Sequence, residues 1–229
     1  MGLSFDAVSG PSRRVVRIWS AGCDGQTDFS SIAKVNPMIA FAQISGITTV
    51  HLRGPETQAT TLTCPSGAEF FGAELRIGAY LPMFPPARIA NMQDGILPTL
   101  PDGRILIDNR AWEMPTPQNL DVFVDHLERA GLLVFDPLVE ELRHVGTVRN
   151  VPERTAQSRF VRAVGLPRRK LQVIERARRA AGLLRAGVPI ADVVRDAGYY
   201  DQPHLSRALR QLIGQTPAEL ARGAQFLAL

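Results

Sequence analysis

Apolar residues change their spacing near Thr116. Before this residue they alternate with polar residues in short runs, which is typical of β-strands. After it they recur at intervals of three and four residues, which is typical of amphipathic helices. The chain of 229 residues therefore joins a β-rich first part to a helical second part, and we predict an α+β fold.

Short runs rich in β-branched and aromatic residues fill the first part, with Gly, Pro and Ser between them. In one run Phe71, Ala73, Leu75 and Ile77 occupy every second position, so we expect one strand face to lie in a core. Closely spaced strands of this kind predict a small β-barrel or sandwich. The predicted strands are Val15–Trp19, Met38–Ile44, Ile47–Arg53, Gln58–Cys64 and Glu69–Ile77, with extended structure again at Arg104–Asp108.

Two proline-rich stretches interrupt this pattern. One is Leu81–Pro86, and the other runs through Pro98 and Pro101. Two interpretations stay open: these loops cover the mouth of a pocket, or they are the ordinary surface loops of a β-domain.

The first helix is expected directly after Thr116, which can cap it, with Pro117 in its first turn and Gly131 at its end. A second helix is expected at about Asp136–Val145. We place the domain boundary near residues 131–136. The prediction is a β-rich domain 1–131 that ends in the amphipathic helix, followed by an all-α domain 132–229.

Charge is distributed unevenly along the chain. Residues 1–150 contain 12 Lys/Arg and 16 Asp/Glu, a net charge of −4, whereas residues 151–229 contain 14 and 6, a net charge of +8. A basic C-terminal part on an acidic body is typical of a protein that binds a polyanion. A solvated basic face without any partner is the alternative.

The segment Val188–Arg222 holds the most informative motif. Pro189 opens a short helix, Gly198 supplies a turn, and Asp201 is placed to cap a second helix that starts at Gln202. Two helices joined by a Gly-containing turn form a helix-turn-helix. Arginines on the outward face of the second helix would fit a major groove, where they reach guanine or phosphate.

This motif resembles a known family. The run Gly198–Pro217, with Gly-Tyr-x-Asp-Gln-x-His-Leu-Ser-Arg and then Ile-Gly-Gln-Thr-Pro, looks like the second helix-turn-helix of AraC-type (AraC/XylS) transcription regulators. Glu153–Leu166 looks like the recognition helix and exit turn of the first unit, and Pro167–Arg185 like the long linker helix. The resemblance implies a bipartite reader of double-stranded DNA. By position, the DNA-facing residues would be Arg154, Gln157, Ser158 and Arg162 in the first unit and Gln202, His204, Ser206, Arg207 and Arg210 in the second.

The first unit departs from the family pattern. Pro152 stands where a capping Ser is usual, Ser158 replaces a customary Arg, and the helix before the turn is reduced to Thr147–Val151. Base readout is therefore expected mainly from the second unit. The linker arginines are expected to divide between phosphate contacts and solvated surface; they are Arg168, Arg169, Arg176, Arg178 and Arg179.

The N-terminal domain resembles, more weakly, the cupin-like β-barrel sensor domains of such regulators. This resemblance implies a small-molecule effector and often a homodimer. An effector changes DNA binding only if it favours one arrangement of the domains or of a dimer. The helix Pro117–Gly131 is our candidate for transmitting that change; an amphipathic helix that only packs is the alternative.

Other classes of protein find little support in the sequence. No apolar run of 18 residues and no secretory signal is visible, so we expect no membrane span and a cytoplasmic location.

Cys23 and Cys64 lie outside any C-x-x-C spacing, which argues against a disulfide framework or a zinc ribbon, and His51 with Cys64 makes too few ligands for a metal site. No catalytic spacing appears, so we predict neither an enzyme nor a cofactor. Two alternatives to the sensor remain: a barrel-domain enzyme, or a protein-interaction module, attached to a DNA-binding domain.

Overall fold

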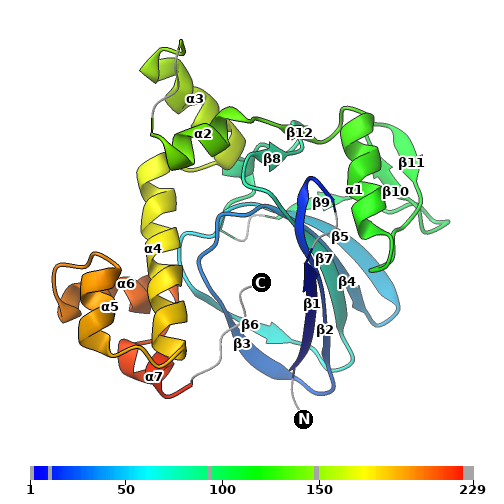
Figure 1. Ribbon diagram of the computed structural model, residues 1–229. Helices are drawn as coiled ribbons and strands as arrows, with labels where there is room; N and C mark the ends of the chain where they lie inside the picture. The colour runs from blue at the N-terminus through cyan, green and yellow to red at the C-terminus, as the bar shows by residue number, and fades with distance from the viewer. Residues whose placement is uncertain (1–2, 10–11, 92–93, 147–149, 224–229) are drawn as a thin grey trace. The chain divides into compact units, whose positions relative to one another are not determined.

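The computed structural model describes residues 3–9, 12–91, 94–146 and 150–223 (Figure 1). A sheet-rich N-terminal region precedes a helical C-terminal region, so the predicted α+β class is confirmed. The chain divides into two compact units, and each contains parts of both regions. Unit 1 comprises the chain up to Thr27, Asn36–Pro55 and Cys64–Pro167; unit 2 comprises Asp28–Val35, Glu56–Thr63 and the chain from Arg168 onward.

The largest sheet has six strands in the order β1-β2-β7-β4-β5-β9, and every neighbouring pair is antiparallel. Strands β1 and β9 lie at opposite edges and do not pair with each other. Of the two predicted arrangements, a small β-barrel or a sandwich, the described strands do not form a closed barrel, and the sheet is open. The strands are β1 (Leu3–Ser9), β2 (Val15–Cys23), β4 (Met38–Ile44), β5 (Ile47–Arg53), β7 (Glu69–Leu75) and β9 (Gly95–Leu97).

The described strands also form three two-stranded pairs, of which β8–β12 and β10–β11 are antiparallel. The observed bounds of β4 and β5 agree with the predicted strands. Ser45 and Gly46 between them adopt the positive φ angles, 52° and 80°, that a tight turn needs. Several shorter strands were not predicted. The small pairs are β3 (Thr27–Ser31) with β6 (Thr60–Cys64), β8 (Ala79–Tyr80) with β12 (Val134–Phe135), and β10 (Ile105–Ile107) with β11 (Arg110–Trp112).

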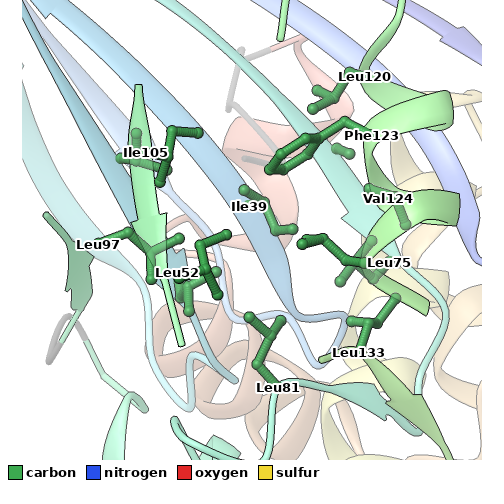
Figure 2. Close-up of a cluster of buried hydrophobic side chains, with 14 of the residues drawn as sticks. Ile39, Leu52, Leu75, Leu81, Leu97, Ile105, Leu120, Phe123, Val124 and Leu133 are labelled. Carbon is green, nitrogen blue, oxygen red and sulfur yellow. The ribbon is translucent and has the colours of Figure 1, made fainter. Parts of the chain in front are cut away.

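One face of the six-stranded sheet and helix α1 (Leu120–Arg129) form the main core of unit 1 (Figure 2). On β7, Ala73 and Leu75 are buried in this core as predicted, but Gly72 and Glu74 are buried as well, so the strand does not alternate between buried and exposed residues. In Figure 2, Leu120 and Phe123 extend from α1 toward Ile39 of β4. Burial of such side chains provides the largest favourable contribution to folding.

Helix α1 begins later than predicted. It starts at Leu120, because residues 117–119 form a turn in which the side chain of Asn119 accepts a hydrogen bond of 2.7 Å from the amide of Thr116. The helices that follow are α2 (Leu138–His144), α3 (Glu153–Val164), α4 (Arg168–Arg185), α5 (Ile190–Asp196), α6 (Gln202–Leu212) and α7 (Pro217–Ala221). Part of the reduced helix predicted at Thr147–Val151 lies outside the described residues. None of the helices in the described part of the chain is long and apolar enough to cross a membrane.

Cys23 and Cys64 form a disulfide, which contradicts the prediction from their spacing. Strand β7 pairs with β2 from Glu69, opposite Gly22, and the turn at 65–68 brings the end of β6 back beside β2. Hydrogen bonds from the Cys23 amide to Ala68 and from the Gly67 amide to Cys23 hold this arrangement. The pairing results from strand topology, which a C-x-x-C search does not detect.

Candidate nucleic-acid interface

The second helix-turn-helix, α5 and α6, lies in unit 2. Asp201 caps α6 as predicted: its side chain accepts a hydrogen bond of 2.7 Å from the amide of His204. Leu205, Leu209 and Leu212 bury one side of the helix. Three predicted DNA-facing residues are exposed, namely Gln202, Arg207 and Arg210.

Two arginines of the linker helix α4 fix the turn of this unit. The guanidinium of Arg176 donates to the carbonyl of Gly198 at 3.3 Å and lies 4.8 Å from the ring centroid of Tyr199. The guanidinium of Arg179 donates to the carbonyl of Asp196, the last residue of α5. Carbonyls at a helix C-terminus lack helical partners, so these cations stabilise the end of α5. The structure therefore gives Arg176 and Arg179 a positioning role that the sequence did not predict.

His204 and Ser206 are less accessible than the other predicted residues of α6, since each is half-buried. The Nδ1 atom of His204 accepts from the amide of Tyr200 at 3.4 Å, and its ring makes an edge contact with Tyr199, with centroids 5.1 Å apart. Burial raises the pKa of Tyr199 above 10.0, whereas the charge and hydrogen bonding of Arg176 lower it. His204 thus packs the start of the recognition helix.

Sequence reasoning missed Tyr200. Its side chain is 91% exposed and stands immediately before Asp201, the cap of α6. Large aromatic side chains are usually buried, so exposure of this kind beside a recognition helix marks a candidate contact residue. The signal was present in the Gly-Tyr-Tyr-Asp run, where two adjacent tyrosines cannot both face the core.

The first recognition helix, α3, lies in unit 1. Ala156, Phe160, Ala163 and Val164 bury one side of it. The four predicted DNA-facing residues are all exposed on the helix, namely Arg154, Gln157, Ser158 and Arg162. Of these, Gln157 donates a hydrogen bond of 2.9 Å to Glu153 one turn earlier, so it is held along the helix surface.

Arg159 of the same helix has a structural role. Its guanidinium binds both carboxylate oxygens of Asp136, at 2.6 and 3.0 Å, and Asp136 also accepts from the amide of Leu138 at the start of α2. Hydrogen bonding to this carboxylate, together with its charge, raises the pKa of Arg159 above its ordinary value. The pair fixes α3 against α2.

Both recognition helices also contact segments from the N-terminal region. In unit 1, α3 packs against β8 and the short 3₁₀ helix η1 (Pro86–Arg88), and a Cβ at Gly165 would lie 2.8 Å from the amide nitrogen of Ala87. In unit 2, the amides of Ala33 and Ala59 donate to the carbonyls of Leu212 and Gln211, at 2.7 and 2.9 Å. Neither contact was predicted from the sequence.

Comparison with known proteins agrees with this geometry. Residues 147–223 match the family model described as a helix-turn-helix domain, of the AraC type. No curated protein and no solved structure matches the chain. The match, which covers residues 147–223 of the 229, supports a DNA-binding transcription regulator. In particular, it supports a regulator of the AraC/XylS type.

Proposed function

We propose that this regulator reads specific DNA sequences with α6 and, to a smaller extent, with α3. The contacts come from the exposed residues Gln202, Arg207 and Arg210 of α6 and Arg154, Ser158 and Arg162 of α3, with Gln157, His204 and Ser206 as lesser contributors. Arginine recognises guanine by two hydrogen bonds in the major groove, and exposed arginine also binds phosphate. The opposite faces of both helices are buried, which supports this orientation of each helix.

DNA binding is controlled by a small-molecule effector of the N-terminal region. One observation carries this part of the proposal: each recognition helix is contacted by a segment from that region, α3 by η1 and α6 by residues around Ala33 and Ala59. A ligand that displaces either segment changes the environment of a recognition helix. The ligand binds the arrangement with the segment displaced and the arrangement with the segment in place with different affinities. This difference supplies the free energy that couples effector binding to DNA binding.

The proline-rich loop is the candidate effector site in unit 1. A cavity of about 10 Å³, the size of one water molecule, lies between this loop and the sheet, lined by Met38, Ile39, Leu52, Leu81, Phe84 and Ile89 among others. An effector would therefore have to displace the loop, and its lining predicts an apolar compound. Because η1 follows Phe84 in the same loop and touches Gly165, this displacement would reach α3.

The remaining parts of the proposal come from the family resemblance and the sequence. The protein is a homodimer that acts in the cytoplasm, with domains 1–131 and 132–229, no enzymatic activity and no cofactor. Helix α1 contributes to transmission through its packing on the sheet. The alternative function, a protein-interaction module, rests on two exposed apolar side chains of the sheet. These are Ile47 of β5 and Ile96 of β9, which are 69% and 60% exposed.

DNA readout is tested on the full chain with a duplex selected from a random library. Affinity for DNA should fall steeply as the salt concentration rises, because arginines that bind phosphates displace counterions from the DNA. Arg207→Ala should weaken binding to the selected duplex by about 1–3 kcal/mol and relax specificity at one base pair. Arg104→Ala is the matched control, since Arg104 is an exposed arginine of the N-terminal region paired with Asp102 at 2.6 Å. Failure of the folded chain to bind any duplex at low salt would refute this part of the proposal.

Effector control is tested with a library of small apolar metabolites. Trp19 is buried and Trp112 makes an edge contact with Phe123 at 6.3 Å, so both indoles report on unit 1. A true effector changes DNA affinity, and DNA changes effector affinity by the same factor. If every compound that binds leaves DNA affinity unchanged, the enzyme or protein-partner alternative replaces the sensor.

A further inference from the structure

The disulfide joins the only two cysteines of the chain and closes a long loop. Cys23 and Cys64 are separated by 41 residues and are 3% and 1% exposed. Cys23 ends β2 and Cys64 ends β6. The sulfurs are thus the covalent junction between two strand ends that are distant in the sequence.

The closed loop contains two segments that pack in unit 2, residues 28–35 and 56–63, which we call the arms. Between them, the chain forms the β4–β5 hairpin of the large sheet. Each arm is therefore joined along the chain to that hairpin at one end and to a cysteine of the disulfide at the other. The arms also bind each other, since Lys34 and Glu56 exchange backbone hydrogen bonds of 3.0 and 2.8 Å.

The arms complete the C-terminus of recognition helix α6. Its last carbonyls, those of Gln211 and Leu212, accept from the amides of Ala59 and Ala33. Ala33 is fully buried, and the Cβ of Ala59 lies 3.2 Å from the position a Cβ would take at Gly214. Carbonyls at a helix end require such partners, so arms held in these positions stabilise the C-terminal end of α6.

We propose that Cys23 and Cys64 are a redox-responsive modification site that sets the DNA affinity of the regulator. This inference goes beyond the effector control proposed above and does not depend on it. This step rests on the DNA binding and the cytoplasmic location proposed above, because cytoplasm contains a reducing thiol pool in which disulfides are usually transient and catalytic or redox-sensing. The oxidised form holds the arms in place and binds DNA more tightly; the reduced form loosens them and binds more weakly.

The exchange is a two-electron reaction with a dithiol reductant. One thiolate of the reductant attacks a sulfur of the disulfide, forms a mixed disulfide and releases the other cysteine as a thiolate, which takes up a proton. The second thiolate of the reductant then displaces the remaining cysteine and closes the reductant's own disulfide. Two electrons and two protons end on Cys23 and Cys64. The exposed turn 65–67 next to Cys64 is the place where local opening admits the reductant.

The test compares oxidised and dithiothreitol-reduced full chain on the duplex selected from the random library, with thiol alkylation and mass measurement to verify each state. We expect reduction to lower affinity by about tenfold, since it weakens the two amide contacts to α6. The double variant Cys23→Ser/Cys64→Ser should have the lower affinity of the reduced wild type, and dithiothreitol should not change it. Equal affinity of the two forms of the wild type, or tighter binding by the reduced form, would overturn the proposal.

A second measurement needs no variant and no DNA. Hydrogen exchange of the Ala33 and Ala59 amides should become faster on reduction, whereas exchange of Ile39 and Leu52 in the β4–β5 ladder should not. This contrast separates release of the arms from general unfolding of the sheet. Unchanged exchange at Ala33 and Ala59 in fully reduced protein would also overturn the proposal. Neither measurement involves an effector, so its failure is distinct from failure of the sensor proposal.

Discussion

The amide of Ala33 donates a hydrogen bond of 2.7 Å to the carbonyl of Leu212, the last residue of the second recognition helix. A residue near the start of the chain thus completes a helix near its end. The equivalent contact of the first recognition helix is steric, where Gly165 meets Ala87. Truncation of the N-terminal region would remove both contacts, so DNA binding is best studied in the full chain.

Ala59→Pro should destabilise the protein and the end of α6. Proline has no amide hydrogen, so the carbonyl of Gln211 loses its donor, at a cost of about 1 kcal/mol in the free energy of unfolding. Ala59→Ser is the matched control because it keeps the amide and adds only one atom beside Gly214. Denaturant unfolding of both variants measures the difference. Equal stability of the two would show that this hydrogen bond has no net effect.

Gly165→Ala should cost more than Gly187→Ala. Both glycines have positive φ angles, 79° and 84°, so alanine is strained at each by about 1–2 kcal/mol. A Cβ at Gly165 also collides with Ala87, whereas a Cβ at Gly187 meets nothing within 4 Å. The excess, about 1–3 kcal/mol, measures the contact between η1 and the end of α3. If both variants lose the same stability, η1 yields freely and the proposed route from loop to helix fails.

The sequence predicted local structure well and long-range contacts poorly. The bounds of β4 and β5 and the start of α6 follow from patterns within a few residues, such as the Ser45-Gly46 turn and the Asp201 cap. Edge strands β1 and β9 were missed; β9 has only three residues, too few to show alternation. The disulfide and the contacts of Ala33 and Ala59 join positions 41 or more residues apart, which periodicity does not encode.

The candidate site shows the same division. The exposed side of α6 could be predicted because one stripe of leucines determines the other side. The role of Arg176 could not be predicted, because an arginine on the polar face of a helix has the same sequence signal whether it binds phosphate or the carbonyl of Gly198. Which arginine meets a carbonyl depends on how α4 crosses α5, and this is a property of the tertiary structure.

Asp201→Ala should weaken the start of α6. The variant removes the acceptor for the His204 amide, and loss of such a cap costs about 1 kcal/mol. Asp201→Asn retains an acceptor at the same position and should recover most of the stability. Since Gln202 begins the helix, we also expect Asp201→Ala, but not Asp201→Asn, to lower affinity for the selected duplex. Identical behaviour of the two variants in denaturation and in DNA titration would contradict a capping role.

Acid should destabilise unit 1 through Asp94. Burial raises the pKa of this carboxyl, but the hydrogen bond from His51 and the charge of Arg53 more than offset burial, and the pKa lies below its ordinary value of 3.8. His51 Nδ1 and Arg53 Nε each lie 3.3 Å from a carboxylate oxygen. The folded state therefore favours the carboxylate, so this contribution is complete above pH 3.8 and is lost as the pH falls through the lower folded-state pKa.

Asp94→Asn should lose about 1 kcal/mol at neutral pH and show a shallower decline in stability below pH 3.8 than the wild type. Asp102→Asn is the control, since Asp102 pairs with Arg104 in an exposed turn where solvent weakens the interaction. Urea unfolding from pH 3 to 7 measures both effects, and parallel pH profiles for the wild type and Asp94→Asn would show that Asp94 is not the responsible group.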